Sequence, residues 1–320
     1  MGVTRLELSA QGLGSARFAL GPLNIAGNLL QALRLRPLAV DPVWRARSRQ
    51  VIRDHDLRLL GLLGGGGPHG YAPDFVRPEP PSFDSSPDAA CHAIATAAPE
   101  RVRYEMAKVI GGSSWDDTPA GRAPRLLLDS LERGEAHLAR RAADQMWVFW
   151  RHVLAPHWPR MREHLEHDVT RRATVIAREG AIGAITGLAP NLSWNDGGLD
   201  FRTASACGAT LQPGAVVFVP CPFIERAVFC GGEPAGAPAP RLPLICYPAV
   251  PTAASPFTRE LIGSTRTRVL AALDTPRTTA DLAQWLHLSY STVSYHLQIL
   301  NRAGLVRRTR HSLEVRYQRH

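Results

Sequence analysis

Hydroxyl and amide side chains crowd the ten residues SYSTVSYHLQ, Ser289 to Gln298. If this segment is helical, Val293, Leu297 and Leu300 share one apolar face and the polar side chains occupy the other. Ser and Thr hydroxyls bond to bases or phosphates, a Gln amide pairs with adenine, and Tyr reaches a phosphate or a thymine methyl. The pattern therefore predicts a helix that reads the major groove of DNA. The residues predicted to contact DNA from this helix are Ser289, Tyr290, Ser291, Thr292, Ser294, Tyr295 and Gln298.

Arginines surround this segment. Residues 255–320 contain ten Arg and four Asp or Glu, a difference of six out of a formal net charge of +9 for the chain. Clustered positive charge is typical of a surface that binds a polyanion. The basic residues predicted to complete the DNA contact are Arg302, Arg307, Arg308, Arg310, His311 and Arg316.

Two capped helices are predicted to hold the polar face in place. The first opens with Thr278 and Asp281, which approximate a capping box. A short turn, His287 to Ser289, leads to the second helix, and Ser289 is its expected N-cap. Gly304 is placed to end that helix in the left-handed conformation.

A further helix and a β-ribbon complete the expected domain. Residues 259–273, RELIGSTRTRVLAAL, have apolar side chains at helical spacing. Two β segments, LVRRT and LEVRYQ, follow Gly304 and are expected to be joined by Arg310, His311 and Ser312. The order helix, helix, turn, helix and ribbon predicts a winged helix-turn-helix over residues 255–320. A packing or protein-interaction role for the same fold is the alternative.

This C-terminal segment resembles the arsenic-repressor (ArsR/SmtB) superfamily of bacterial transcription regulators. The positions that carry the resemblance are Val293, Ser294, His296, Leu297, Leu300, Ala303, Gly304, Leu305 and Tyr317. The resemblance implies a homodimeric repressor that binds an operator of inverted symmetry and changes its DNA affinity when an effector binds. The preceding region resembles, more weakly, a long N-terminal domain of actinobacterial members. That likeness rests on ARFALGPL, GYAPDF, PHWPRMREHLEHD, VVFVPCPFI and CYPAV.

The chain departs from the metal-sensing members of that superfamily. Their thiolate ligands would fall within residues 279–286, where this sequence reads TADLAQWL. A terminal helix that could carry His and acidic ligands is not expected after the ribbon. Metal sensing at the familiar positions is therefore not expected, because transition metals need such ligands. We expect the helix at 260–273 and the N-terminal domain to form the dimer contact.

Residues 1–254 are predicted to form an N-terminal regulatory and dimerisation domain, which makes the chain α+β. Helical periodicity dominates to about residue 180, for example in residues 14–35 and 126–154. A Gly- and Pro-rich loop is expected at residues 61–88.

The part of this domain from residue 190 to 250 is predicted to consist mainly of β structure. The segment LSWNDGGLDF at 192–201 predicts a hairpin around Asp196-Gly197. The apolar runs GAVVFVPCPFI and LPLICYPAV predict strands, and residues 248–257 predict a linker to the last domain.

A cluster of aromatic residues is the candidate effector site of the N-terminal domain. Three Trp in a short span can wall a pocket for a flat organic molecule, with His or Arg as polar anchors. The residues predicted to line this site are Trp147, Trp150, His157, Trp158 and Arg160. Ordinary core packing of the same aromatics is the competing interpretation.

A metal- or redox-responsive regulator is the alternative within the N-terminal domain. Five Cys are present without a C-x-x-C pair, and free buried thiols are the expectation. His164 and His167, with Glu163 and Asp168, have a spacing that can bind a metal, although a solvated helix face is the simpler interpretation. Four of the Cys fall close together in sequence: Cys207, Cys221, Cys230 and Cys246.

Catalysis is not expected. The sequence contains no Gly-x-Ser-x-Gly elbow, dinucleotide fingerprint, His-Glu-x-x-His or P-loop, so no catalytic or cofactor-binding residues are predicted. An enzyme with an appended winged-helix interaction module is the rival from another class. No apolar run reaches the length of a membrane span, and the N-terminus lacks the apolar core of a secretory signal. We expect a cytoplasmic, nucleoid-associated protein.

Overall fold

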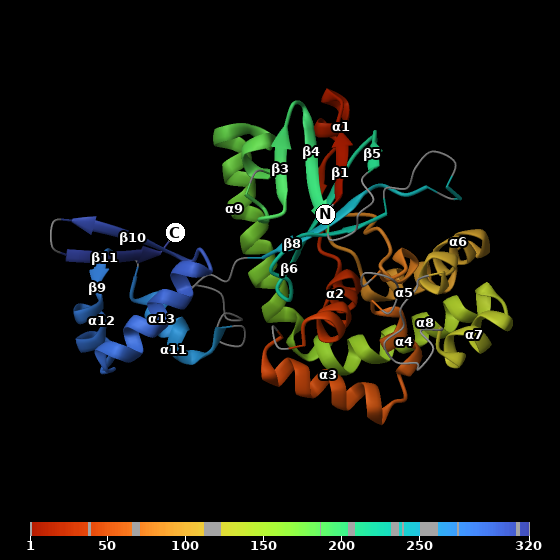
Figure 1. Cartoon of the computed structure of the whole chain (residues 1–320), viewed down its shortest axis with the longest axis horizontal. Helices are drawn as coiled ribbons and strands as arrows, with labels where there is room; N and C mark the ends of the chain where they lie inside the picture. Colours follow the sequence, from red (N-terminus) through yellow and green to blue (C-terminus); the bar gives the residue numbers. More distant parts are fainter. Residues whose placement is uncertain are drawn as a thin grey trace. The chain divides into compact units, whose positions relative to one another are not determined.

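Prolines mark the starts of helices in the computed structural model of the chain, which has an α+β fold (Figure 1). Proline suits the first helical position because that residue needs no N–H donor and its φ is already helical. Four helices begin in this way: α2 (Pro22–Leu35), α3 (Pro42–Asp54), α5 (Pro87–Ala95) and α6 (Pro99–Ile110). The other α-helices described before residue 186 are α1 (Ala10–Gly14), α4 (Arg58–Leu63), α7 (Arg125–Glu132), α8 (Glu135–Phe149) and α9 (Trp158–Ile185), which is kinked at Gly180.

The structure describes residues 2–37, 40–65, 71–111, 123–185, 187–203, 209–231, 237–238, 240–249, 262–273, 275–311 and 314–319. Nearly all of the linker expected at 248–257 lies outside these ranges, as does Cys207. Across the described ranges, none of the helices combines the length and the apolar character that crossing a bilayer requires.

The chain divides into two units, each described here by itself. The N-terminal unit comprises Met1–Trp158 and Val169–Pro248, and the C-terminal unit comprises Ala249–His320 together with Pro159–Asp168 of α9.

The first sheet of the N-terminal unit joins the start of the chain to its middle. Its strands lie in the order β3-β4-β1-β5. The predicted hairpin is confirmed: β3 (Leu192–Asn195) pairs antiparallel with β4 (Gly198–Thr203), and Asp196 and Gly197 between them have φ of 43° and 76°. β1 (Gly2–Glu7) lies between β4 and β5 (Ala209–Leu211). The first strand of the chain therefore pairs with strands that follow it in the sequence by almost 200 residues.

The second sheet has the order β2-β6-β8-β7. Both apolar runs predicted as strands are strands: β6 (Val217–Cys221) and β8 (Leu244–Pro248) pair in parallel and are buried. β2 (Arg17–Phe18) and β7 (Val228–Cys230) lie at the two edges. The helical expectation is therefore wrong for residues 17–18, where the chain pairs with β6 before α2 begins at Pro22.

The helical period predicted through residues 126–154 is not one helix. Gly134 has φ of 98° and separates α7 from α8. A π-helical turn, Trp150–Leu154, and a 3-10 turn, Ala155–His157, then precede α9. Pro156 explains the break because proline lacks the N–H that an α-helix needs and clashes with the preceding turn.

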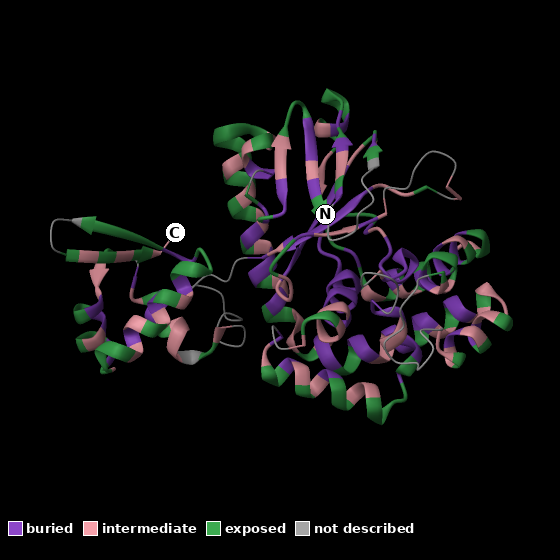
Figure 2. Cartoon of the chain, viewed as in Figure 1, coloured by how far each residue is buried: buried purple, intermediate pink, exposed green. Residues whose placement is uncertain are grey.

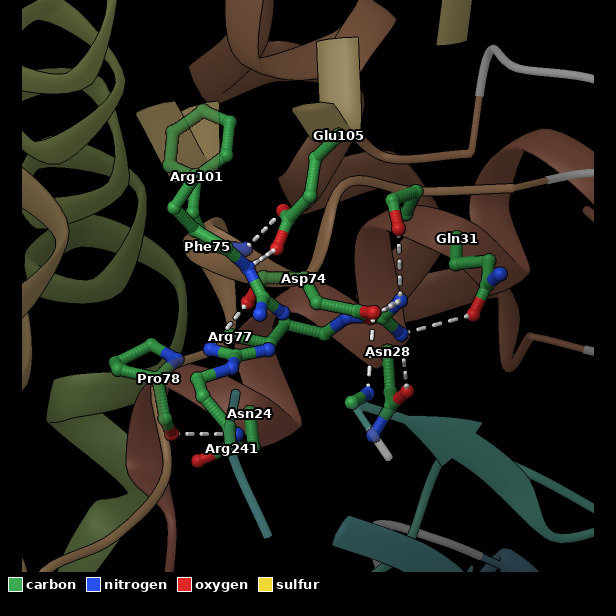
Figure 3. A network of polar contacts seen from close by, with 12 residues as sticks. Asn24, Asn28, Gln31, Asp74, Phe75, Arg77, Pro78, Arg101, Glu105 and Arg241 are labelled. Atoms are coloured by element: carbon green, nitrogen blue, oxygen red, sulfur yellow. Dashed lines mark hydrogen bonds and ion pairs between the residues drawn. The ribbon is translucent and has the colours of Figure 1, made fainter. Parts of the chain in front are cut away.

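The loop predicted at 61–88 is shorter than expected, because α4 extends to Leu63 and α5 begins at Pro87. The described residues between them are irregular and largely buried. We call residues 71–85 the strap. It contains one 3-10 turn, Asp74–Val76, and Phe75, Val76 and Arg77 are only 2–3 % exposed. Arg77 Nη1 donates to Asn28 Oδ1 and Gln31 Oε1 of α2, both at 3.2 Å, and Arg77 also forms an ion pair with Asp74 (Figure 3).

The strap is also tied to α6 and to the residues beyond β7 (Figure 3). Phe75 N donates to Glu105 at 2.6 Å, and Glu105 forms an ion pair with Arg101. Gly231 N donates to the Asp74 carboxylate at 3.0 Å, and Arg241 donates to the Asp74 carbonyl at 3.0 Å. Burial raises the pKa of Glu105. These polar contacts satisfy an irregular buried segment that has no helix or strand ladder of its own.

In the described part of residues 249–320, the C-terminal unit has three helices and a small sheet, and it also includes Pro159–Asp168 of α9. The helices are α11 (Ser264–Ala271), α12 (Thr279–Leu286) and α13 (Tyr290–Arg302). The strands β9 (Arg277–Thr278), β10 (Val306–His311) and β11 (Glu314–Arg319) pair in the order β10-β11-β9. This is the predicted winged helix-turn-helix. The helix predicted over 259–273 is interrupted at Gly263, which has φ of 84°, and α11 begins at Ser264. Residues 259–261 lie outside the described ranges.

Glycine at position 27 leaves room for the strap, which gives a first prediction. A Cβ at Gly27 would lie 2.7 Å from Cγ and 2.8 Å from Cδ of Arg77. We expect Gly27→Ala to lower the free energy of unfolding by about 1–3 kcal/mol, because the buried Arg77 must shift. Six of the seven Trp precede residue 195, so urea unfolding followed by Trp fluorescence reports mainly on this unit.

Gly61 is the matched control for that substitution. It lies inside α4, and a Cβ there would meet nothing within 4 Å. Gly61→Ala is expected to raise stability by about 0.5–1 kcal/mol, because Ala favours the helix. Equal effects of the two substitutions would show that the Arg77 contact does not govern stability.

Candidate nucleic-acid interface

Helix α13 is fixed at both ends by its own sequence. Ser289 is the N-cap, as predicted, and its Oγ accepts from Thr292 N at 3.1 Å. The same Oγ lies 3.0 Å from Ser291 Oγ and 2.7 Å from Thr292 Oγ1. The Ser289 hydroxyl therefore forms hydrogen bonds with two other hydroxyls that were predicted to contact DNA. Gly304 has φ of 70°, the predicted left-handed stop. The length of the helix is therefore set locally.

Packing decides which side of α13 faces solvent. Val293, Leu297 and Leu300 are at most 1 % exposed and join the core made with α11 and α12. The opposite line, at spacings of four, three and four residues, is exposed. It consists of Ser291, Tyr295, Gln298 and Arg302. Figure 2 shows this division between buried and exposed sides along the helices of the C-terminal unit.

The predicted DNA-contacting residues of this helix differ in their solvent exposure. Tyr290 and Tyr295 are 62 % and 56 % exposed, whereas Ser294 and Thr292 are only partly exposed. Asn301 is exposed and lies seven residues after Ser294, on the same side. The sequence reasoning missed Asn301, although its spacing from Ser294 and its amide were visible signals.

The wing places its arginines on two faces. In the register of β10 and β11, Arg308 is opposite Tyr317 and Arg310 is opposite Val315, whereas Thr309, next to Arg308, is opposite Arg316. Because side chains alternate along a strand, Arg308 and Arg310 share the face of Tyr317, and Arg307 and Arg316 lie on the other. Tyr317 packs against the helical core, so the Arg308 face is the one turned toward the helices.

The structure differs from the prediction for the connection between the two strands of the wing. Arg310 and His311 were expected in the connection, but β10 extends through both of them. The strand pairing continues to the end of β10, where Arg310 lies opposite Val315 and His311 lies opposite Glu314. Arg316 forms an ion pair with Glu314 at 3.0 Å, which reduces its free charge. The side chain of His311 lies outside the described part of the chain.

Helix α12 positions α13 and is itself capped as predicted. Thr278 Oγ1 accepts from Asp281 N at 3.1 Å, and Asp281 Oδ2 accepts from Thr278 N at 3.0 Å. The bonds from Thr278 lower the pKa of Asp281. His287 then adopts the left-handed conformation with φ of 52°, and Arg268 of α11 donates to the Leu286 carbonyl at 2.9 Å. The C-terminal end of α12 is thus tied to α11 by a hydrogen bond as well as by the shared core.

One exposed aromatic on α12 escaped the sequence reasoning. Trp285 is 59 % exposed, and the Arg277 guanidinium lies 3.7 Å from the centre of its ring. Arg277 also donates to the Ala272 carbonyl at 2.8 Å, which fixes the stacked pair at the β9 edge of the sheet. The pair follows from the arrangement of β9 beside α12, and local spacing does not reveal it.

Three of the five predicted effector residues, Trp150, His157 and Trp158, form ring pairs in the structure. Trp150 is 4 % exposed and meets Trp158 edge to face, with ring centres 5.1 Å apart. His157 meets Trp44 of α3 in the same way at 4.9 Å, and Arg47 Nη1 lies 3.0 Å from His157 Nε2. Edge-to-face contact is how aromatic rings pack in protein interiors. Trp147 on α8 is half-buried, and Arg160 on α9 is exposed and groups with the C-terminal unit.

The helix that carries His164 and His167 is not a solvated face throughout, which corrects that interpretation. His164 and Asp168 are each 1 % exposed, whereas Glu163 and His167 are exposed. Met161 and Leu165 are buried beside them, so spacings of three and four residues make one buried stripe.

Three of the clustered cysteines share one face of the second sheet. The register pairs Cys246 with Val219 and Cys230 with Leu244, which places Cys221, Cys230 and Cys246 on the same side. Burial raises the pKa of Cys221 to about 12, and the contact with Cys246 together with burial raises that of Cys230. Such thiols are poor nucleophiles. Within the described ranges, no group of three or more His, Cys, Asp or Glu is arranged to hold a metal ion.

Comparison with known families agrees with the architecture of the C-terminal unit. Residues 262–309 match a family model described as a helix-turn-helix domain. No curated protein and no solved structure gives a significant match to the chain. The C-terminal unit is therefore a helix-turn-helix domain of the kind with which transcription regulators bind DNA.

The capping box yields a second prediction. Thr278→Ala is expected to destabilise α12 by about 0.5–2 kcal/mol, because the backbone N–H of Asp281 loses its acceptor. Asp281→Ala should act similarly, and the double substitution should cost less than the sum, since both remove one reciprocal pair. Hydrogen exchange of the amides in residues 278–302 measures the effect. Strict additivity would contradict the reciprocal arrangement.

The capping box also predicts how the stability of α12 changes with pH. The folded pKa of Asp281 is lowered, so its stabilising contribution is present above the unfolded pKa and is lost as the pH falls through the folded pKa. Protection of α12 should therefore decrease on acidification in the wild type, with a smaller decrease in Asp281→Asn.

Proposed function

We propose that this protein is a sequence-specific, DNA-binding transcription regulator that acts on duplex DNA through its C-terminal unit. One observation carries the proposal: the outward line of α13 has Ser291, Tyr295 and Gln298 and no acidic group, and the Arg308 face of the wing lies on the side of the helices. Uncharged hydrogen-bonding side chains suit base edges, and guanidinium groups suit phosphates.

We further propose an ArsR-type regulator that binds as a homodimer to an inverted repeat and represses from it. The support is the resemblance of residues 293–317 together with the helix-turn-helix match. A winged helix offers a single reading helix, so two copies are needed to recognise two symmetric half-sites. Sedimentation of the free protein and of its complex with a selected operator tests the stoichiometry.

The effector in this proposal is a small organic molecule bound by the N-terminal unit, and no catalytic turnover is involved. The support is the concentration of aromatic side chains around Trp150 and Trp158, beside Trp44 and His157. Thermal unfolding with a panel of aromatic compounds and, separately, of divalent ions tests the idea. A shift with the ions alone would favour the alternative, a metal-responsive regulator.

The wing gives the third prediction. Arg308→Ala and Arg310→Ala are expected to weaken binding to specific and random DNA alike, and each should reduce the slope of log K against log salt by about 0.9. The reason is the loss of one phosphate contact. Fluorescence anisotropy with a labelled duplex at several salt concentrations measures both quantities.

Arg307→Ala is the matched control for the wing, since Arg307 is equally an exposed arginine of β10 but lies on the opposite face. It should leave the slope nearly unchanged. Equal losses for Arg307→Ala and Arg308→Ala would contradict the assignment of the phosphate-binding face.

The reading helix gives the fourth prediction. Gln298→Ala and Tyr295→Ala are expected to cost about 1–3 kcal/mol on the operator and little on random DNA, because each removes a base contact. Competition experiments with operators carrying single base-pair changes locate the affected positions. Loss of equal size on random DNA would show that these side chains do not read bases.

A further inference from the structure

The positive charge of this chain is concentrated in two places. Residues 255–320 carry six of the nine net charges. Residues 42–58 have five Arg and two Asp, and residues 150–157 have one Arg and no acid, which adds a net charge of +4. The remaining residues therefore have a net charge of −1. A bias toward arginine that was merely compositional would be spread along the chain.

The second concentration lies on α3 and on the π turn Trp150–Leu154 of the N-terminal unit. Arg49 and Arg53 are exposed and lie one turn apart on α3. Arg47 of the same helix donates to the His152 carbonyl at 2.9 Å, and the exposed rings of His55 and His152 stack with centres 4.5 Å apart. Helix α3 and the π turn Trp150–Leu154 are thus held together by direct contacts. We call the exposed residues Arg49, Arg53, His55, Arg151 and His152 the α3 patch.

Little negative charge offsets the α3 patch. Asp56 is occupied by Arg58, which approaches it at 2.5 Å, and this bond lowers the pKa of Asp56. Asp54 is the other acid of residues 42–58. A surface with several guanidinium groups and imidazole N–H edges offers many donors to a polyanion.

The aromatic side chains near the α3 patch indicate which polyanion it fits. Trp44 and Trp150 are each 4 % exposed, so neither presents a ring on which an unstacked base could lie. Binding of single-stranded nucleic acid depends on such stacking, whereas a duplex presents its phosphates and keeps its bases stacked. The exposed rings of His55 and His152 stack on each other, and the patch offers N–H donors that suit the phosphates of double-stranded DNA.

We propose that the α3 patch is a second DNA-binding surface, which contacts the phosphates of duplex outside the segment read by the winged helix. This inference rests on the proposed function for the identity of the polyanion. The contact carries no sequence information, because backbone phosphates are alike at every position. It adds affinity and salt dependence to binding on long DNA.

The test compares a duplex just long enough for the winged-helix footprint with one extended by about 20 base pairs on each side. For the wild type, the slope of log K against log salt is expected to be steeper on the long duplex by about 0.9 for each added phosphate contact. In Arg49→Glu/Arg53→Glu the long and short duplexes should give the same slope. Both residues are exposed, so the fold should be retained, which circular dichroism checks.

Arg125→Glu/Arg133→Glu is the control with the same change of net charge. These two arginines are exposed at the ends of α7, away from the α3 patch in sequence, and the variant should keep the difference between long and short duplexes. Equal slopes for the wild type on both duplexes would overturn the proposal, as would an equal loss in the control. It would also be overturned if the α3 variant lost binding to anionic phosphatidylserine vesicles while keeping the slope on long DNA. Failure of the proposed function itself would appear separately, as absence of sequence preference on the short duplex.

Discussion

The burial of three side chains of α13 is the constraint on which the interface depends. Val293, Leu297 and Leu300 lie in the core with Leu270, Leu282 and Leu286, and a helix can satisfy that core in only one rotation about its axis. Once the apolar stripe faces inward, Ser291, Tyr295 and Gln298 face outward, because they occupy the opposite side of the helix. A polar side chain buried in that stripe would destabilise the core and would also reorient the residues that we propose to contact DNA.

Local chemistry explains why so much of the C-terminal unit could be predicted from sequence. The capping box of Thr278 and Asp281, the Ser289 cap and the Gly304 stop each involve residues three or fewer positions from a helix end, so their patterns are visible in a short segment. The N-terminal unit depends on distant contacts instead. No local pattern pairs β1 with β4, and none shows that Arg77 lies across Gly27 and bonds to Asn28. The strap was expected to be a loop for the same reason, since its partners come from α2, α6 and the segment after β7.

Within the candidate site, the residues of α13 were likewise easier to predict from the sequence than those of the wing. Residues on α13 could be assigned to a face by helical periodicity, whereas the wing required the pairing register. A shift of one residue would exchange the two faces of β10, moving Arg308 from the side of Tyr317 to the opposite side. The sequence alone placed Arg310 and His311 in the connection and so left that parity open. Trp285 and its Arg277 partner were missed because the contact joins a strand to a helix.

Strand β10 shows how one set of residues meets two requirements. It lies at the edge of its sheet and carries Arg307, Arg308 and Arg310, all exposed. An unpaired edge invites association with another strand, and charged side chains there oppose it by mutual repulsion. In the proposed complex, DNA phosphates neutralise the charges of Arg308 and Arg310, so the repulsion that opposes association of free wings becomes a favourable interaction on the duplex. Removal of Arg308 or Arg310 should therefore affect both the solubility of the free protein and its affinity for DNA, whereas removal of Arg307 should affect the solubility alone.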